Sequence, residues 1–208
     1  RIGAQQGLIE RTSVLEVADL NRELMCQWQE QAQQSASDFE LGLWDGSYPE
    51  ADLAAVAALV DVMNTAPRGA LELEDEHTTP EQLRQRQQQR LARGQILWTL
   101  YARHMPSGEL AGFTEVVWNP RRPEIVMQGG TGVWPKYRNK GLGRWLKAAM
   151  IEKVLRERPS VKRFVTGNAQ TNAPMLKINV EMGFKPYHAE YAWQIETERV
   201  LHYLAGRR

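Results

Sequence analysis

The sequence is poor in cysteine, since Cys26 is the only one among 208 residues. A single cysteine excludes both an intramolecular disulfide framework and a cysteine-rich zinc site. A chain of this length buries roughly 70% of the surface that its unfolded form exposes, so its core needs no such support. His104, His188 and His202 are scattered without metal-ligand spacing. We therefore expect no metal cofactor.

Long apolar runs are missing as well. No stretch approaches the ~18 apolar residues that span a bilayer, and Arg1 to Gln6 lack the apolar run of a signal peptide. We expect no membrane partner and, by default, a cytoplasmic location. The chain does not begin with methionine, so we expect it to be the retained part of a longer precursor.

Neither sign of charge is in excess. The 26 Lys and Arg against 25 Asp and Glu give a net charge of +1, which excludes a polycation that acts through bulk charge. The charges are nevertheless segregated. Residues 38–81 hold eleven acidic side chains against Arg68 alone, and residues 134–163 hold ten basic side chains against Glu152 and Glu157. An acidic and a basic face suit a protein that brings a cation and an anion together.

The apolar patterns predict one α/β domain behind a leading helix. Strands are predicted at 39–44, 96–104, 110–118, 125–134, 163–166 and 191–195, and helices at 5–35, 49–64, 79–94, 141–158 and 172–183. Pro106-Ser107-Gly108 makes the second and third strands a hairpin. We therefore divide the chain into a leading helical segment, 1–35, and a main domain, 36–208.

The segment with the clearest chemistry is 130–144. A strand runs into a basic loop with Gly141 and Gly143, and the loop opens directly into a helix. The first turn of a helix has four unpaired N–H groups and about half a positive charge, which suits a phosphate. Glycine lets a diphosphate approach the backbone closely. The alternative is a solvated basic loop whose glycines only turn the chain; no Walker or dinucleotide fingerprint is present.

Arg138-Asn139-Lys140-Gly141-Leu142-Gly143 resembles the Arg/Gln-x-x-Gly-x-Gly/Ala motif of the GNAT N-acetyltransferase superfamily. A second stretch, from Asn168 to Gly183-Phe184, resembles that family's next motif, and the order of elements is similar over about 36–196. The resemblance implies an α/β fold with a mixed, mostly antiparallel central sheet flanked by helices. Two adjacent parallel strands of this sheet splay apart in a V, and acyl-CoA lies in the gap.

The resemblance also implies which residues bind the cofactor. Backbone groups of Thr131, Gly132 and Val133 would pair with the pantetheine arm, as an added strand does. The diphosphate would bind the loop formed by Arg138, Asn139, Lys140, Gly141, Leu142 and Gly143, next to Arg144. Asn168, Asn172 and Asn179 would contact the pantetheine arm or the thioester. Asn172 could instead, or in addition, cap a helix, and Asn179 could simply be exposed.

Family members commonly transfer the acyl group directly to an amine, which needs a base or a water chain. The tyrosine that often protonates the leaving thiolate is replaced here by Asn179, four residues before Gly183, with Tyr187 and Tyr191 as nearby substitutes. Met127 occupies the position of a glutamate found in some relatives. We therefore expect Glu115 or Glu124 to end a water relay, unless both are exposed edge residues.

These features predict an acetyl-CoA-dependent N-acetyltransferase that acetylates the primary amine of a small molecule. The acids Glu72, Glu74, Asp75 and Glu76 favour a cationic amine. Two alternatives stay open: a non-catalytic acyl-CoA-binding module of a tandem protein, and nucleic-acid binding by the basic helix 141–158. That helix lacks an aromatic platform, so we expect no nucleic-acid partner. We expect a monomer or a homodimer.

Overall fold

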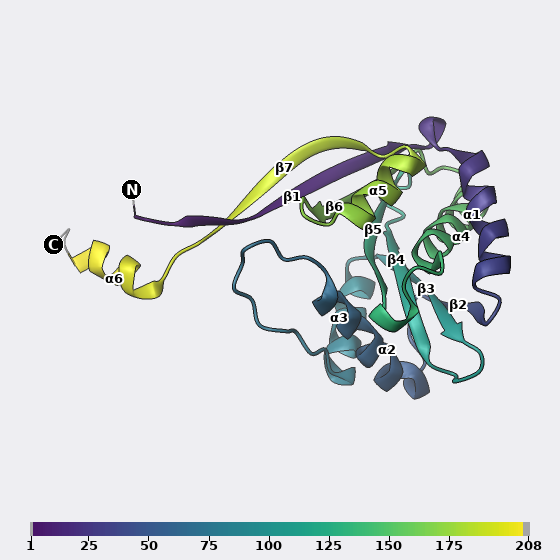
Figure 1. Ribbon diagram of the computed structural model, residues 1–208, viewed down its shortest axis with the longest axis horizontal. Helices are drawn as coiled ribbons and strands as arrows, with labels where there is room; N and C mark the ends of the chain where they lie inside the picture. Colours follow the sequence, from purple (N-terminus) through teal and green to yellow (C-terminus); the bar gives the residue numbers. More distant parts are fainter. Residues whose placement is uncertain (1, 206–208) are drawn as a thin grey trace.

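The computed structural model describes residues 2–205. Seven strands form one sheet in the order β2-β3-β4-β5-β6-β1-β7 (Figure 1). The strands are β1 (Gln5–Glu16), β2 (Phe39–Asp45), β3 (Ile96–His104), β4 (Leu110–Trp118), β5 (Ile125–Val133), β6 (Arg163–Ala169) and β7 (Lys185–Gln194). Neighbouring strands are antiparallel except for β5 and β6, which are parallel. The predicted mixed, mostly antiparallel α/β fold is confirmed.

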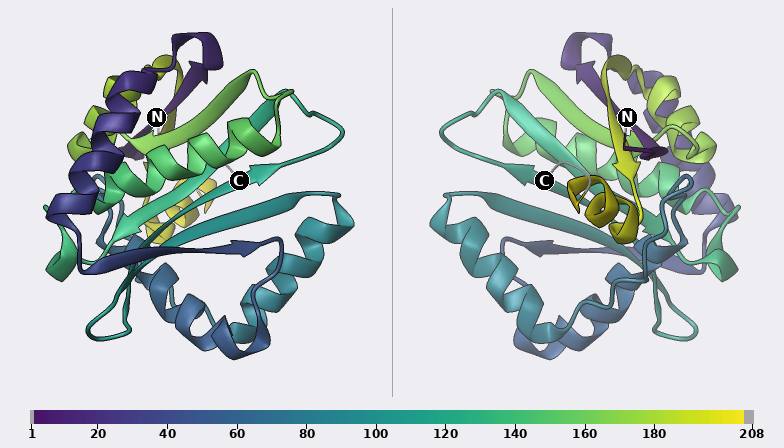
Figure 2. Two further views of the ribbon diagram at one scale, coloured as in Figure 1. Left: turned by 90° about the vertical axis from the view of Figure 1, so that its right-hand side faces the viewer. Right: turned by 90° about the vertical axis from the view of Figure 1, so that its left-hand side faces the viewer.

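Helices cover both faces of this sheet. They are α1 (Arg22–Ser35), α2 (Leu53–Val60), α3 (Pro80–Ala92), α4 (Leu142–Glu157), α5 (Ala173–Met182) and α6 (Thr197–Ala205), with the short 3-10 helices η1 (Val17–Asp19), η2 (Glu50–Asp52), η3 (Asp61–Thr65) and η4 (Pro135–Tyr137). Figure 2 shows α1 and α4 on one side of the sheet and α2 and α3 on the other. None of the helices in the described residues is long and apolar enough to cross a membrane.

Each face has its own core. On the α4 face, Leu15, Val126, Phe164 and Leu146 are fully buried in one cluster. On the α2 and α3 face, a second cluster contains residues such as Trp44, Val56, Leu97 and Phe113. Because side chains alternate along a strand, the buried residues of a strand belong to one cluster or the other according to the face on which they lie.

The leading segment differs from the prediction. Residues 5–16 form β1 instead of a helix, and β1 lies between β6 and β7. The apolar spacing of Leu15, Leu20, Leu24 and Trp28 suggests one continuous helix, but the helix starts only after Asn21. The Asn21 side chain accepts a hydrogen bond from the Leu24 N–H and so caps α1. Helix α1 therefore begins at Arg22. The boundary at residue 35 stays a prediction, but the sheet takes one of its inner strands from the segment before it.

Local signals elsewhere predicted the elements well. The hairpin of β3 and β4 pairs from Ile96↔Trp118 onward. Helix α3 begins with a full capping box between Thr79 and Gln82. Asn172 caps α5, since its Oδ1 accepts a hydrogen bond from the Met175 N–H at 3.3 Å. In each case the residues that determine the structure are neighbours in the sequence.

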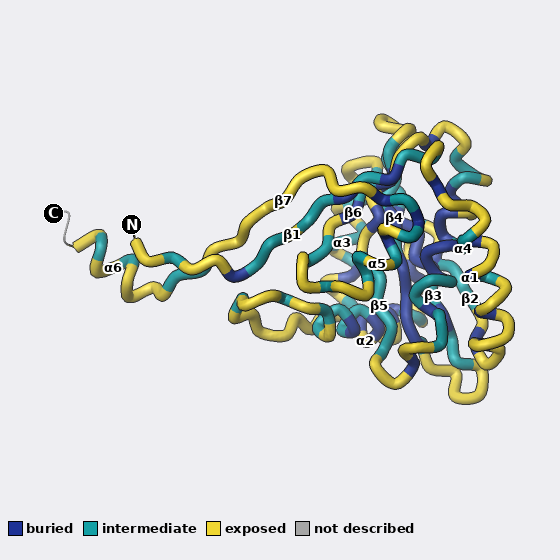
Figure 3. Tube along the Cα trace, turned by 45° about the horizontal axis from the view of Figure 1, so that its top comes forward, coloured by how far each residue is buried: buried dark blue, intermediate teal, exposed yellow. Residues whose placement is uncertain are grey.

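Two strands leave the main body together. The outer parts of β1 and β7 form a two-stranded ribbon whose tip carries both ends of the described chain and α6 (Figures 1 and 3). The loop 66–79 reaches this ribbon, because the Ala70 N–H donates to the Gly7 carbonyl and the Gln194 side chain bonds to Ala70 and Glu72. The acidic loop, 66–79, thus lies beside the ribbon.

Candidate functional site

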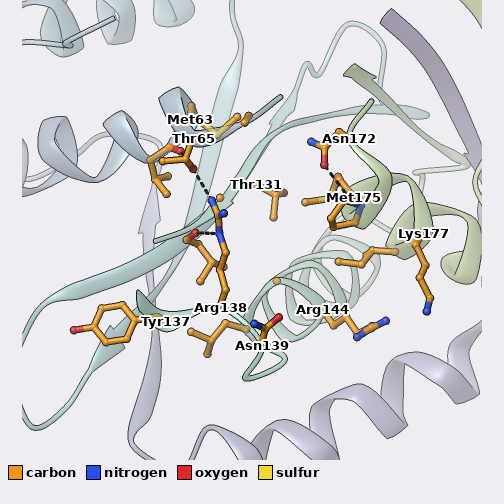
Figure 4. A pocket seen from close by; sticks show the side chains of 18 of the residues that line it. Met63, Thr65, Thr131, Tyr137, Arg138, Asn139, Arg144, Asn172, Met175 and Lys177 are labelled. Atoms are coloured by element: carbon orange, nitrogen blue, oxygen red, sulfur yellow. Dashed lines mark hydrogen bonds between the residues drawn. The ribbon is translucent and has the colours of Figure 1, made fainter. Parts of the chain in front are cut away.

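A cavity of about 440 Å³ opens where β5 and β6 separate. The two strands pair in parallel only from Ile125↔Arg163 to Gln128↔Thr166. We call the point just beyond this last pair the fork. The cavity is lined by the end of β5, the start of α4, the first turns of α5, and η3 (Figure 4).

The end of β5 offers one wall of backbone. Thr131, Gly132 and Val133 pair on one side with β4 and on the other side line the cavity. Such a strand edge can pair with amide groups of an extended ligand. The splay predicted between two parallel strands is therefore present, and the three residues predicted at its edge line the cavity.

The start of α4 offers a bare helix N-terminus. Gly141 stands at the N-cap with a φ of +81°, a left-handed conformation that favours glycine, and no side chain caps the helix. An added Cβ at Gly143 would meet only Ile178, at 3.8 Å. The first N–H groups of α4 are thus open to a ligand, and the geometry fits a diphosphate.

The basic side chains around the loop differ in how they lie relative to the cavity. Arg138 crosses the cavity: its Nε donates to the Val133 carbonyl at 3.0 Å and its Nη2 to Thr65 Oγ1 at 2.6 Å (Figure 4). Arg144 lines the cavity while it bonds to Glu181 at 3.2 Å. Lys140 is not among the lining residues, and its Nζ lies 5.4 Å from the centre of the Phe39 ring.

Of the three asparagines predicted to contact the cofactor, one lines the cavity and two do not. Asn172 lines the cavity and also caps α5. Asn179 is 2% exposed and donates from Nδ2 to Asn168 Oδ1 at 2.7 Å. Neither Asn168 nor Asn179 is part of the cavity wall. Their hydrogen bond instead joins α5 to β6. The predicted residues on the wall are Thr131, Gly132, Val133, Arg138, Asn139, Gly141, Leu142, Gly143, Arg144 and Asn172.

Sequence reasoning missed several residues of the wall. Met63 and Thr65 come from η3, Tyr137 from η4 and Lys177 from α5. The stop signal Pro67-Arg68-Gly69 marks the end of the η3 region, yet nothing local indicates that it reaches β5. Lys177 lies one turn beyond the cap of α5, which the Asn172-Ala173-Pro174 signal could have located.

Glu115 is the one predicted carboxylate that lies near the fork. It is partly buried on β4 and accepts a hydrogen bond from the Gly130 N–H. Burial raises the pKa of this carboxyl, and the guanidiniums of Arg90 and Arg86 oppose that rise. Glu115 also lines a second cavity of about 80 Å³, and Met63 lines both this cavity and the larger one.

Two other catalytic candidates lie elsewhere. Glu124 precedes β5 at the end opposite the cavity, and its ion pair with Lys162 lowers the pKa of its carboxyl. Tyr187 is 74% exposed on β7, where its ring contacts His188. Neither side chain lines the cavity. Strand position decided both cases, since residues near in sequence to a motif can lie at the far end of a strand.

The acids of the loop 66–79 are partly neutralised by the protein itself. Asp75 pairs with Arg68 at 2.9 Å, and Glu76 pairs with Arg86. His77 pairs with Asp61 of η3 at 2.8 Å, and this carboxylate raises the pKa of the imidazole. Glu72 and Glu74 are the loop acids whose carboxylates have no cationic partner within residues 2–205. Of the four acids expected to attract a cationic amine, two are therefore already paired with cations of the protein.

Comparisons with known proteins agree with this geometry. A tandem GNAT protein from the clavulanic acid biosynthesis pathway is 26% identical, with a TM-score of 0.72 over 92% of this chain and 55% of that chain. A GCN5-related N-acetyltransferase from Sphaerobacter thermophilus is 15% identical, with a TM-score of 0.59 over 92% of this chain and 52% of that chain. This chain thus spans about half the length of each.

The protein yncA from Salmonella typhimurium, solved with its cofactor acetyl-CoA, shares the fold at 18% identity, with a TM-score of 0.52 over 71% of this chain and 80% of that chain. No curated protein matches this chain. The family model of the acetyltransferase (GNAT) family matches residues 57–184, which contain β5, the loop, α4 and α5. Because this match covers more than half of the sequence, the chain belongs to the GNAT acetyltransferase family.

Proposed function

We propose that this protein is an acetyl-CoA-dependent N-acetyltransferase that acetylates the primary amine of a cationic small molecule. The observation that carries the proposal is the cavity at the fork, which joins a bare helix N-terminus to the edge of β5 that no further strand of the described residues covers beyond Gln128. The first provides N–H groups for a diphosphate, and the second provides backbone partners for the amides of pantetheine. Both features match the chemistry of coenzyme A.

The residues present fit this cofactor. The N–H groups that begin α4 would hold the diphosphate, with Arg138 and Arg144 as nearby cations. Thr131 to Val133 would hold the pantetheine arm along the edge of β5. Bound there, acetyl-CoA would supply the acetyl group as a thioester that exchanges its carbon–sulfur bond for a bond to the acceptor nitrogen, with the thiolate as the leaving group.

The acceptor amine must lose a proton before it can attack. Glu115 is suited to receive it, because burial raises the pKa of its carboxyl above the ordinary value and so makes the carboxylate a stronger base. The cavity of about 80 Å³ beside Glu115 is large enough to hold water. A water relay from the fork to Glu115 would therefore carry the proton. Asn179 has no acidic proton to give, so the thiolate leaves without its help.

The test is release of free thiol from acetyl-CoA when a panel of amines is added, with acetylated products identified by mass spectrometry. We expect transfer to primary amines that carry further positive charge. Glu115→Gln should lower the rate strongly, while Glu124→Gln, at the other end of β5, should leave it unchanged. Absence of transfer to every amine, with acetyl-CoA still bound in calorimetry, would contradict the proposal.

A second function, a non-catalytic acyl-CoA-binding module of a tandem protein, has its own support. The 26% identical neighbour is a tandem GNAT protein, and this chain covers 55% of it. By the resemblance to the family, Met127 also stands where some relatives carry a glutamate, and Asn179 where they often carry a tyrosine. This function predicts tight binding of acetyl-CoA without thiol release in the presence of any amine.

A further inference from the structure

At the fork, two glycines each lie directly beside a glutamate side chain. The last parallel pair is Gln128↔Thr166, and the next residue on each strand is a glycine, Gly129 on β5 and Gly167 on β6. An added Cβ at Gly129 would stand 2.8 Å from Oε1 of Glu115. An added Cβ at Gly167 would stand 2.5 Å from Oε1 of Glu10, which comes from β1. The two carboxylates therefore lie against the two strands just where they separate.

Both carboxylates lie on the same face of the sheet. Val126 and Phe164 are buried in the α4 core, so Gly129 and Gly167, three positions further along each strand, point to the opposite face. In β1, Leu15 pairs with Phe164 on the α4 face, which places Glu10 on the opposite face as well. This face is open at the fork, because Met127 is 49% exposed there.

The two carboxylates differ in their surroundings. Glu115 is partly buried and hydrogen-bonded to the Gly130 backbone. Glu10 is exposed, and within residues 2–205 no cationic side chain pairs with it. Glu10 lies directly opposite Glu190 of β7. Glu190 pairs with His188 at 2.9 Å, so Glu10 is the carboxylate of this opposed pair that no cation of the described residues neutralises.

We propose that Glu10 is a specificity-determining residue that binds a second cationic group of the acceptor, so that the preferred substrates are diamines. This inference rests on the proposed acetyl transfer. The nitrogen that is acetylated must be neutral when it attacks, and it gives its proton toward Glu115. A lasting positive charge elsewhere on the acceptor is what the exposed Glu10 can hold. Glu10 lies against Gly167 of β6 and Glu115 lies against Gly129 of β5, and β5 and β6 are neighbouring strands about 4.8 Å apart where they pair.

Glu10 lies outside the part of the chain that the family model matches. The family match begins at residue 57, whereas Glu10 is on the first strand, which inserts between β6 and β7. Glu16 is a matched control on the same strand and the same face. It pairs with Arg163 at 3.0 Å, at the end of β6 away from the fork.

The experiment compares putrescine with n-butylamine, which has the same carbon chain and one amine. Calorimetry without acetyl-CoA measures the Kd of each amine for the wild type, Glu10→Gln, Glu10→Asp and Glu16→Gln, and initial rates measure KM and kcat. We expect Glu10→Gln to weaken putrescine binding about tenfold and to raise its KM alike, with kcat and n-butylamine binding unchanged. Glu10→Asp should restore part of the affinity, and Glu16→Gln should behave as wild type.

Two outcomes would overturn the inference. One is wild-type binding of putrescine no tighter than that of n-butylamine; the other is equal loss of both amines in Glu10→Gln. Thermal melting checks that each variant is folded, and calorimetry with acetyl-CoA checks that the cofactor still binds. If the wild type binds putrescine through Glu10 but transfers acetyl to no amine, the proposed function fails and the binding role of Glu10 stands.

Discussion

The side chain of Lys147, on α4, is buried in the core together with its terminal amino group. Its side chain is 1% exposed, and its Nζ lies 5.4 Å from the centre of the Phe184 ring. No carboxylate among residues 2–205 forms an ion pair with it. Burial alone lowers the pKa of this amine from 10.5 to about 7. Because the uncharged amine is favoured inside the protein, stability must depend on pH.

The sign and size of this dependence follow from the two pKa values. Between pH 7 and pH 10.5 the unfolded chain binds a proton that the folded chain has released, so the free energy of unfolding rises with pH in this window. Integration from pH 7 to pH 9 gives a rise of about 2 kcal/mol. Lys147→Met removes the titrating group and with it this rise. The variant should therefore gain most over the wild type at pH 7 and below.

Urea unfolding at pH 7 and pH 9 tests this, since urea does not screen charge as guanidinium does. The difference between the wild type and Lys147→Met cancels the other groups that titrate in this range. Lys153→Met is the control on the same helix, because its ammonium is bonded to Glu157 at 2.6 Å. If Lys147→Met shows the same rise from pH 7 to pH 9 as the wild type, Lys147 is charged in the folded protein and the reasoning is wrong.

Three further predictions concern the fork and the cavity. Thr65→Val should tighten acetyl-CoA binding several-fold in calorimetry, because Arg138 then loses the hydrogen bond that holds it across the cavity; unchanged affinity would mean that this bond does not compete with the cofactor. Gly141→Ala should lower the free energy of unfolding by about 1 kcal/mol, since φ is +81° there, and weaken acetyl-CoA binding; full stability in urea would contradict it. The rate of transfer should rise with pH through the raised pKa of Glu115, as only the carboxylate accepts a proton. That limb should vanish in Glu115→Gln and persist in Glu124→Gln, so a profile unchanged in Glu115→Gln would exclude Glu115 as the base.

The sequence determined the elements whose signals are contiguous. The capping box of Thr79 and Gln82, the hairpin turn at Pro106-Ser107-Gly108 and the cap at Asn172 each involve residues within a few positions of one another. The glycine loop before α4 belongs to the same class, because a bare helix N-terminus is a local property. Together with the apolar patterns, these local signals predict the α/β class and the half of the cavity for which we propose a diphosphate.

Tertiary structure alone decided which distant residues meet. Nothing near Glu10 in the sequence shows that β1 inserts between β6 and β7 and brings this carboxylate to Gly167. In the same way, Glu124 and Glu115 look alike as strand glutamates, yet one lies at the far end of β5 and the other beside the fork. Strand order and burial arise from contacts between segments far apart in the chain, so a pattern of neighbouring residues contains no record of them.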